Sequence, residues 1–270
     1  MAYETILTDD RDRVRYITLN RPEKRNALSP LVLDELIEAA LESEQDADVG
    51  CIVIRGAGTA FCSGFDITPG SRPPGGAGPI RADINRMGHI TTRMGQLWAL
   101  TKPVIAQVHG YCVAGGTDLA MHCDMIIAAE DAMIGFPPVR AQGCPPTHMW
   151  TYLVGPQWAK RMLLTGDFID GKTAERIGMV LTAVPPDALE AEVHALASRI
   201  AMVPSDLLAA NKSICNKAVD LMGRSLLQDL AREADAIGHQ AKSALEFSRI
   251  AREDGLRAAL SWRDDKFKRS

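Results

Sequence analysis

The 270-residue sequence lacks several features that mark specialised classes of protein. No apolar run approaches the ~18 residues that a membrane-spanning helix needs, and the cysteines form no CxxC pair. Most cysteines lie in apolar strand or turn contexts, which favours reduced, buried thiols over disulfides or a zinc site. We therefore expect no structural metal. The six cysteines are Cys51, Cys62, Cys112, Cys123, Cys144 and Cys215.

Concentrated positive charge is also missing. The net charge is -4, and no block of Lys and Arg occurs, which argues against general binding to nucleic acid or to anionic membranes. The first residues, MAYETILTDDRDR, carry neither a basic segment nor an apolar segment of the kind found in signal peptides. We expect a cytoplasmic protein without a membrane partner.

The patterns that are present predict an α/β core over residues 1–200 and a helical C-terminal module over residues 201–270. Alternating segments at 3–8 and 13–20 indicate a hairpin, and Ser29-Pro30 is typical of a helix start. Residues 80–100 have helical periodicity, and the Gly- and Pro-rich residues 68–79 indicate a surface loop that could cover a pocket. A second Pro-rich loop is expected at 136–150.

The C-terminal module is predicted to contain three amphipathic helices, at residues 204–222, 225–242 and 245–266. The middle helix has an apolar face that a lone helix cannot bury, so we expect it to pack on the core or on another subunit. This face contains Leu226, Leu227, Leu230, Ala234 and Ile237.

The stretch 107–124, QVHGYCVAGGTDLAMHCD, joins an apolar strand at 103–108 to a helical pattern that begins near Gly115-Gly116. Main-chain N–H groups at such a helix start have no partner within the helix and can bind a negatively charged oxygen. Asp118 lies in the same first turn. The stretch therefore indicates a catalytic corner, or else a tight turn in which Asp118 only favours the helix dipole.

A second corner has the same layout. Residues 51–56 form an apolar strand, and the chain then reaches Ser63-Gly64-Phe65-Asp66. Two similar units in tandem indicate a repeated supersecondary element whose glycine turns face each other. Gly56 and Gly58 invite a dinucleotide-binding reading, but the third glycine of that motif is missing and no helix follows.

Residues 166–173, GDFIDGKT, match the phosphate-binding pattern GxxxxGK[ST] at every position. A true phosphate-binding loop follows a buried strand, whereas the preceding residues here have helical spacing. We interpret the segment as a turn between two helices, with Asp170 as the N-cap of the second helix.

Several ordered segments together resemble the crotonase superfamily, which includes the enoyl-CoA hydratases and isomerases. They are RPEKRNALS, IVIRGAGTAFCSGFDI, KPVIAQVHGYCVAGGTDLAMHCDMIIAAEDAMIGFP and LLTGDFIDGKTAERIGMV. The resemblance implies a crotonase-like superhelix of ββα turns with a C-terminal helical trimerisation module. It also implies a homotrimer or dimer of trimers, an acyl-CoA thioester as substrate, and no cofactor beyond the coenzyme A of that substrate.

The resemblance places an oxyanion hole on the main-chain N–H groups of Phe65 and Gly115. It places the coenzyme A contacts on the segment from Lys24 and Arg25 to Ala27, and on Asp66 and Ile67. Without the resemblance, a solvated charged turn explains Lys24 and Arg25 equally simply.

The departures from the family pattern concern the acid/base groups. A hydratase of this family uses two glutamates; here Asp118 occupies the first position and Pro138 the second. Proline cannot transfer a proton through its side chain. Either Asp118 performs both transfers or another group substitutes. His148, in the same loop, is a candidate for the pocket or for capping the next helix.

The sequence therefore predicts reversible hydration of a 2-enoyl-CoA through a thioester enolate, with Asp118 as acid/base. One carboxylate also suits a double-bond isomerase, a hydratase/lyase or a thioester hydrolase. A catalytically weak acyl-CoA-binding protein is the alternative from another class.

Overall fold

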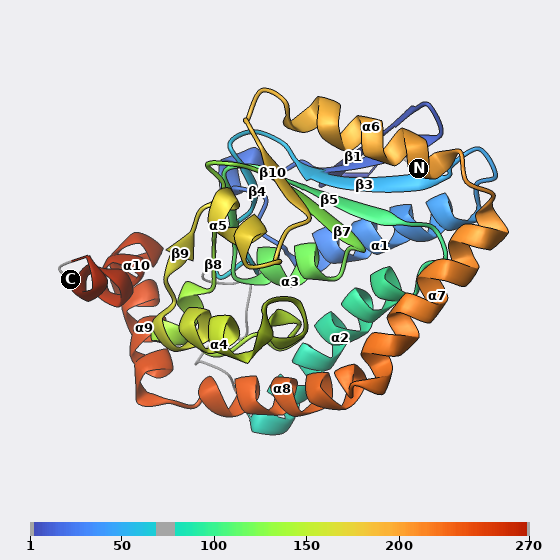
Figure 1. The fold of residues 1–270 in the computed structure, drawn as a ribbon. Coiled ribbons are helices and arrows are strands. Elements are labelled where there is room, and N and C mark those ends of the chain that lie inside the picture. Colours follow the sequence, from blue (N-terminus) through green and yellow to red (C-terminus); the bar gives the residue numbers. More distant parts are fainter. Residues whose placement is uncertain (1–2, 69–78, 269–270) are drawn as a thin grey trace.

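A computed structural model describes residues 3–68 and 79–268 (Figure 1). These residues form a six-stranded sheet in the order β1-β2-β3-β5-β7-β10 and a four-stranded sheet in the order β4-β6-β8-β9. The larger sheet contains β1 (Ile6–Arg11), β2 (Val14–Leu19), β3 (Cys51–Gly56), β5 (Val104–Val108), β7 (Met125–Ala129) and β10 (Thr182–Val184). The smaller contains β4 (Ala60–Cys62), β6 (Tyr111–Val113), β8 (Met133–Gly135) and β9 (Phe168–Ile169).

The helices surround these sheets. Helix α6 packs on β3 and β5, and α1 packs on β1 and β2; the two helices lie on opposite faces of the larger sheet (Figure 1). The helices are α1 (Pro30–Gln45), α2 (Ile80–Ala99), α3 (Gly115–Met121), α4 (Trp150–Thr165), α5 (Gly171–Arg176), α6 (Leu189–Ala201), α7 (Ser205–Leu221), α8 (Arg224–Gly238), α9 (Lys242–Glu253) and α10 (Leu256–Asp264). The predicted α/β class is confirmed.

The same strand step is made three times. The pairs β3/β4, β5/β6 and β7/β8 each place their first strand in the larger sheet and their second in the smaller. Because β4 pairs in parallel with β6, with Cys62 opposite Cys112, the turns that follow these two strands lie at the same sheet edge. The predicted repeat is therefore present, and it brings the two glycine corners together.

Most predicted segments are found with shifted ends. The hairpin is β1/β2, and Ser29 caps α1 by accepting the Val32 N–H at 3.2 Å. Pro137 and Pro138 begin a short 3-10 helix, so the loop at 136–150 is less irregular than predicted. The predicted covering loop at 68–79 falls almost wholly outside the described residues. None of the described helices is both long and apolar enough to cross a membrane.

The GDFIDGKT segment does not form a phosphate-binding loop. Helix α4 ends at Gly166, which has φ +68°, and β9 is only two residues long. Asp170 caps α5 by accepting the Thr173 N–H at 2.7 Å, as predicted. Lys172 forms an ion pair with Glu130 at 2.8 Å.

The prediction of one helix over residues 245–266 is wrong, because the chain forms two helices there. Gly255 lies between α9 and α10 with φ +90°, a conformation outside the right-handed helix that glycine adopts without steric cost. The break lets both helices pack around Phe247 and Ala259, together with Ala141 of the Pro-rich loop.

Of the two expectations for the apolar face of α8, packing on the core is not found. Leu226, Leu230 and Ile237 are exposed, whereas Arg224, Gln228 and Asp235 are buried. Packing of α8 against α2 therefore buries its polar side. Residues of the C-terminal module are thus buried against the rest of the chain. The domain boundary at residue 200 stays a prediction.

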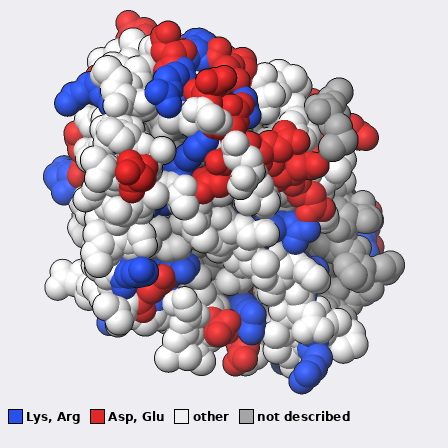
Figure 2. All heavy atoms as spheres, turned by 90° about the vertical axis from the view of Figure 1, so that its right-hand side faces the viewer, with Lys and Arg blue, Asp and Glu red and all other residues white. Residues whose placement is uncertain are grey.

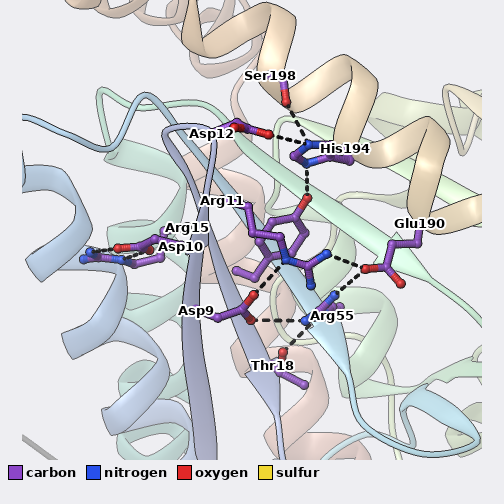
Figure 3. A network of polar contacts seen from close by, with 11 residues as sticks. Asp9, Asp10, Arg11, Asp12, Arg15, Thr18, Arg55, Glu190, His194 and Ser198 are labelled. Carbon is purple, nitrogen blue, oxygen red and sulfur yellow. Dashed lines mark hydrogen bonds and ion pairs between the residues drawn. The ribbon is translucent and has the colours of Figure 1, made fainter.

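A polar network fixes the N-terminal hairpin to β3 and α6 (Figure 3). The buried Tyr16 donates or accepts a hydrogen bond with Nδ1 of His194 at 2.7 Å. The guanidinium groups of Arg11 and Arg55 each lie 4.7 Å from the centre of the Tyr16 ring. Arg11 also binds Glu190 of α6 at 2.7 Å. These contacts join the edge of the sheet to the helix that covers it.

Replacing Tyr16 with phenylalanine is expected to lower the free energy of unfolding by about 1 kcal/mol, because the ring stays but its hydrogen bond to His194 is lost. Chemical denaturation measures the difference. Tyr3→Phe is the matched control, since the Tyr3 hydroxyl donates to Glu42 at the surface, and its effect should stay within about 0.5 kcal/mol. Equal effects of the two substitutions would contradict the structural role of the Tyr16 hydroxyl.

Candidate active site

Two chain corners face each other at the edge of the smaller sheet. Gly64 follows β4 with φ +100°, and Ala114 follows β6 with φ +53°. A Cβ built on Gly64 would lie 2.7 Å from the Cβ of Ala114 and 3.1 Å from the main-chain nitrogen of Gly115. Since both residues hold unusual main-chain conformations, the peptide units that follow them, ending at Phe65 and Gly115, are fixed in orientation.

The N–H groups of Phe65 and Gly115 have no main-chain acceptor in the part of the chain that the structure describes. The main-chain groups on either side of the Phe65 N–H are paired. The Gly64 carbonyl accepts from the Leu28 N–H, and the Asp66 N–H donates to the Leu28 carbonyl. The Phe65 ring covers Gly115, and its atoms would lie 2.8 Å from a Cβ at that position. The two corners therefore present a pair of available N–H donors.

These corners border a cavity of about 520 Å³. Its walls come from the segment after β2, the two corners, the Pro-rich loop, α8 and α10. Residues that line it include Lys24, Arg25, Ala27, Phe65, Asp66, Ile67, Ala114, Pro138, Gly143, Cys144, Asp235, His239 and Arg263. The five residues predicted to contact coenzyme A are thus together at one cavity, beside Phe65 and Pro138.

Asp118 is buried in the first turn of α3, the helix that begins at Gly115, and it is not among the residues that line this cavity. Its Oδ1 accepts a hydrogen bond from the Thr147 hydroxyl at 2.8 Å, and its Oδ2 is buried without a hydrogen-bond partner among the described residues. Burial raises the pKa of Asp118 to about 7; the Thr147 bond opposes this rise and the charge of Asp235 adds to it. The carboxyl therefore exists in both protonation states near neutral pH.

A buried chain of hydrogen bonds positions Thr147 and α3. Gln228 of α8 donates to the Thr147 carbonyl at 2.7 Å and lies 3.0 Å from Nε2 of His122. His122 Nδ1 lies 2.7 Å from the Asp118 carbonyl oxygen, and burial lowers the pKa of His122 to about 4. The ring is therefore neutral, with its proton on Nδ1 and with Nε2 accepting from Gln228. Arg224 completes the chain by donating to Gln228 at 3.0 Å.

The segment predicted to meet coenzyme A has internal ion pairs. Asp66 is bound by Arg21 at 3.1 Å and by Lys24 at 3.6 Å. Burial alone would raise the pKa of Asp66, but hydrogen bonds from Thr68 and Arg21, with the charge of Lys24, lower it to about 2. Arg25 lies 5.5 Å from the centre of the Tyr111 ring. Basic and acidic groups thus share the mouth of the cavity.

The chain resembles known proteins along almost its whole length. The sequence profile of the family described as enoyl-CoA hydratase/isomerase matches residues 9–251. A protein named "Probable enoyl-CoA hydratase echA8" from Mycobacterium bovis is 36% identical over 227 residues, which are 82% of this chain and 84% of the relative. The chain belongs to the enoyl-CoA hydratase/isomerase family.

Other members of this family match over nearly complete lengths. The crotonyl-CoA hydratase of Syntrophomonas wolfei is 32% identical over 271 residues, covering 99% of both chains. The crystal structure of an enoyl-CoA hydratase from Mycobacterium smegmatis superposes with a TM-score of 0.92 at 36% identity, covering 97% of this chain and 94% of that chain. The predicted crotonase-like fold is confirmed.

Three further polar residues, His148, Arg140 and His89, are not among those that line the cavity beside Pro138. Nε2 of His148 is 2.7 Å from the Thr151 hydroxyl in the first turn of α4; this contact is between side chains and does not cap the main-chain N–H groups of the helix. Arg140 is largely buried and has internal partners: it donates to the Thr165 carbonyl and pairs with Asp264. His89 lines a second cavity, between α1 and α2, whose walls also include Phe65 and Asp66, so this cavity adjoins the Phe65 corner.

Two cysteines near the family's site are not activated as nucleophiles. Burial raises the pKa of Cys62 to about 12, and burial with the charge of Asp235 raises the pKa of Cys144 to about 12. Both thiols are protonated at neutral pH, whereas the thiolate is the reactive form.

Asp235 and His239 are the polar groups that sequence reasoning missed. They line the cavity beside Pro138, but they lie on the helix that was assigned to oligomerisation. The signal in the sequence was the polar series Arg224, Gln228 and Asp235, which repeats at helical spacing and marks a buried polar face.

Replacing Thr147 with valine is expected to raise the pKa of Asp118 above about 7, because the hydroxyl stabilises the ionised carboxylate through its hydrogen bond. Carbon-13 NMR of labelled aspartate measures this pKa. Thr91→Val is the control, since the Thr91 hydroxyl donates to the Met87 carbonyl within α2. An unchanged or lower Asp118 pKa in the Thr147→Val protein would contradict the assigned hydrogen bond.

Proposed function

We propose that this protein is an enoyl-CoA hydratase that adds water reversibly to the C2–C3 double bond of a 2-enoyl-CoA thioester. One observation carries the proposal: two available main-chain N–H groups, on Phe65 and Gly115, stand on facing corners, and a buried carboxyl with a pKa of about 7, Asp118, lies in the first turn of the helix that begins at Gly115. Hydration needs donors that stabilise the negative charge of the enolate and a group that transfers a proton. The two N–H groups suit the first role, and the Asp118 carboxyl suits the second.

The N–H pair serves the thioester oxygen. When the oxygen of water bonds to C3, the electrons of the double bond move toward the thioester carbonyl, which becomes an enolate oxygen. Two fixed donors stabilise that charge without having to reorganise, and one donor of this kind contributes about 2.7–4 kcal/mol. The fixed conformations of Gly64 and Ala114 support this role, because they orient the donors before substrate arrives.

Asp118 is the acid/base group in this scheme. An acid/base group works best when its pKa lies near the working pH, and burial places the pKa of Asp118 at about 7. Its Oδ2, which has no hydrogen-bond partner among the described residues, is the atom that gives a proton to C2 on hydration and removes it on dehydration.

Coenzyme A is proposed to lie along Lys24, Arg25, Ala27, Asp66 and Ile67. Their common position at the cavity supports this placement. The basic groups of Lys24 and Arg25 suit phosphates, and main-chain groups near Ala27 and Ile67 suit the adenine edge. No other cofactor is needed for the proposed reaction.

The protein is also proposed to form a trimer or a dimer of trimers. Helices α7 and α8 expose large apolar side chains: Leu221 is 89% exposed, Leu226 66%, Leu230 55% and Ile237 63%. Such a set marks an interaction surface. Figure 2, which views the side on which α7 lies, shows acidic side chains gathered in its upper part and, below them, a largely uncharged surface with a few small groups of basic and acidic side chains.

The test is an assay of the purified protein with crotonyl-CoA, longer 2-enoyl-CoAs, 3-enoyl-CoAs and saturated acyl-CoAs. Hydration removes the ultraviolet absorbance of the conjugated thioester and releases no thiol. Conversion of 3-enoyl-CoA to 2-enoyl-CoA without hydration would instead establish an isomerase, the second candidate that Pro138 favours. Release of thiol would establish a hydrolase, and binding without turnover would refute catalysis on these substrates.

A further inference from the structure

We propose that His239, held by Asp83, is the second acid/base group of this cavity and performs the proton transfer for which Pro138 has no suitable side chain. The inference rests on the proposed hydratase function and adds a residue to it. It concerns the C-terminal end of α8, where His239 is the C-cap residue.

A carboxylate from a different helix holds the His239 ring. Nδ1 of His239 lies 2.6 Å from Oδ2 of Asp83, in the first turn of α2. The Asp83 side chain is fully buried and also binds Arg86. Burial alone would raise the pKa of Asp83, but the hydrogen bond and charge of His239, with the charge of Arg86, hold the pKa below its usual value. Asp83 is therefore ionised.

The ionised carboxylate fixes which ring nitrogen carries the proton. Because a carboxylate can only accept, Nδ1 of His239 must be the donor, and the neutral ring then has its lone pair on Nε2. The distance from Nε2 to Oδ1 of Asp235 is 3.6 Å, longer than a hydrogen bond. Nε2 is thus left as the atom that can accept a proton.

His239 lines the cavity. Gly143 packs against its ring and against Asp235: a Cβ on Gly143 would be 3.3 Å from Nε2 of His239 and 2.1 Å from Oδ1 of Asp235, so only a residue without a side chain fits here. Gly143, Asp235 and His239 all line the cavity that also contains Phe65 and Pro138. The imidazole therefore borders the same cavity as the Phe65 corner.

Acidic side chains from two helices contact the two ring nitrogens of His239. Asp83 of α2 lies at Nδ1, and Asp235 of α8 lies 3.6 Å from Nε2. Arg86 forms an ion pair with the other carboxylate oxygen of Asp83. The Cys144 main-chain N–H fixes Asp235 by donating to its Oδ1 at 2.9 Å. The buried Asp118 feels the charge of Asp235, which links the two acid/base groups electrostatically.

The proposed step is balanced as follows. Nε2 of His239 takes a proton from water as the water oxygen bonds to C3. The double-bond electrons move onto the thioester oxygen and return to form the C2–H bond, with the proton supplied by protonated Asp118. The products are a neutral 3-hydroxyacyl-CoA, an Asp118 carboxylate and a His239 imidazolium. Proton exchange through solvent restores the starting forms, and dehydration runs the same steps in reverse.

The experiment separates water addition from proton exchange at C2. The His239→Gln variant is expected to hydrate crotonyl-CoA about 10²-fold more slowly or worse. It should still exchange the C2 protons of butyryl-CoA with D₂O, because Asp118 performs that exchange alone. The Asp83→Asn variant keeps a polar partner for His239 but does not require its proton to be on Nδ1. Its kcat should fall about 10-fold or more, and the pH dependence of its kcat should differ from that of the wild type. Coenzyme A affinity measured by calorimetry should be unchanged in both.

His194→Gln is the matched control, since His194 also pairs with an aspartate, Asp12 at 3.1 Å, but lies outside the cavity; its activity should equal that of the wild type. Equal hydration rates for wild type and His239→Gln would overturn the role of His239. So would loss of hydration, C2 exchange and coenzyme A affinity together in both variants, because that pattern indicates a structural role. Wild-type protein inactive on every enoyl-CoA would instead refute the proposed function.

Discussion

Replacing Asp118 with asparagine is expected to slow hydration of crotonyl-CoA by about 10²–10⁴-fold, because an amide can neither give nor take the C2 proton. Exchange of the C2 protons of a saturated acyl-CoA with D₂O should fall equally. Coenzyme A affinity should be retained, since the proposed contacts to coenzyme A lie on other segments of the chain. Rates followed at the absorbance of the conjugated thioester, with exchange followed by NMR, measure both losses.

Asp170→Asn is the matched control for this substitution. Asp170 caps α5 away from the cavity, and asparagine serves as an N-cap equally well. Its rates should match those of the wild type. An Asp118→Asn protein with full activity would remove Asp118 from the mechanism.

The same variant has a predicted effect on stability with a definite sign. The pKa of Asp118 is raised in the folded protein from 3.8 to about 7, so the folded state holds a proton that the unfolded chain releases. The stabilising contribution of this group is therefore full below its unfolded pKa and is lost as the pH rises through about 7. Relative to wild type, the Tm of Asp118→Asn should increase between about pH 5 and about pH 8. A constant difference would contradict the raised pKa.

Replacing Gly64 with alanine is expected to lower kcat by about 10²–10³-fold, the effect of losing one oxyanion donor. The new Cβ would lie 2.7 Å from that of Ala114 and 3.1 Å from the Gly115 nitrogen, at a residue with φ +100°. Relief of this contact must move one corner relative to the other, so the Phe65 and Gly115 N–H groups no longer converge. Steady-state kinetics should show the loss in kcat rather than in coenzyme A affinity.

Gly95→Ala is the control for a glycine substitution without a clash. Nothing lies within 4 Å of a Cβ at Gly95, in the interior of α2, so activity should be unchanged. Stability should rise by up to about 1 kcal/mol, because alanine is the better helix former. If Gly64→Ala were as active as Gly95→Ala, the facing corners would not form the oxyanion site.

Local signals were enough to predict the two corners. A strand, a glycine and an acidic residue recur at Gly64 to Asp66 and at Gly115 to Asp118, and main-chain conformation at such turns is limited by sterics within a few residues. The rejection of GDFIDGKT also rested on local periodicity, and the N-cap hydrogen bond of Asp170 bears it out.

Helix α8 shows what local signals could not decide. Its leucines have the spacing of a core face, and a rule that places apolar residues inside assigns them to the interior. The tertiary structure reverses this, because Gln228 finds His122 and the Thr147 carbonyl as partners, and Asp235 finds the Cys144 N–H. Buried polar groups are tolerated when they are hydrogen-bonded, and all of these partners are distant in sequence.

The sequence by itself thus determined the family and the repeated strand–turn units, since these depend on motifs of residues close together in the chain. It also showed that Asp118 and Pro138 occupy the two positions at which hydratases of this family have glutamates. Only the tertiary structure decided which groups surround Pro138. Asp83 and His239 are 156 positions apart and meet at 2.6 Å because α2 and α8 pack side by side. Pairings of this kind depend on helix docking, whose free energy is spread over many contacts and leaves no local mark on the sequence.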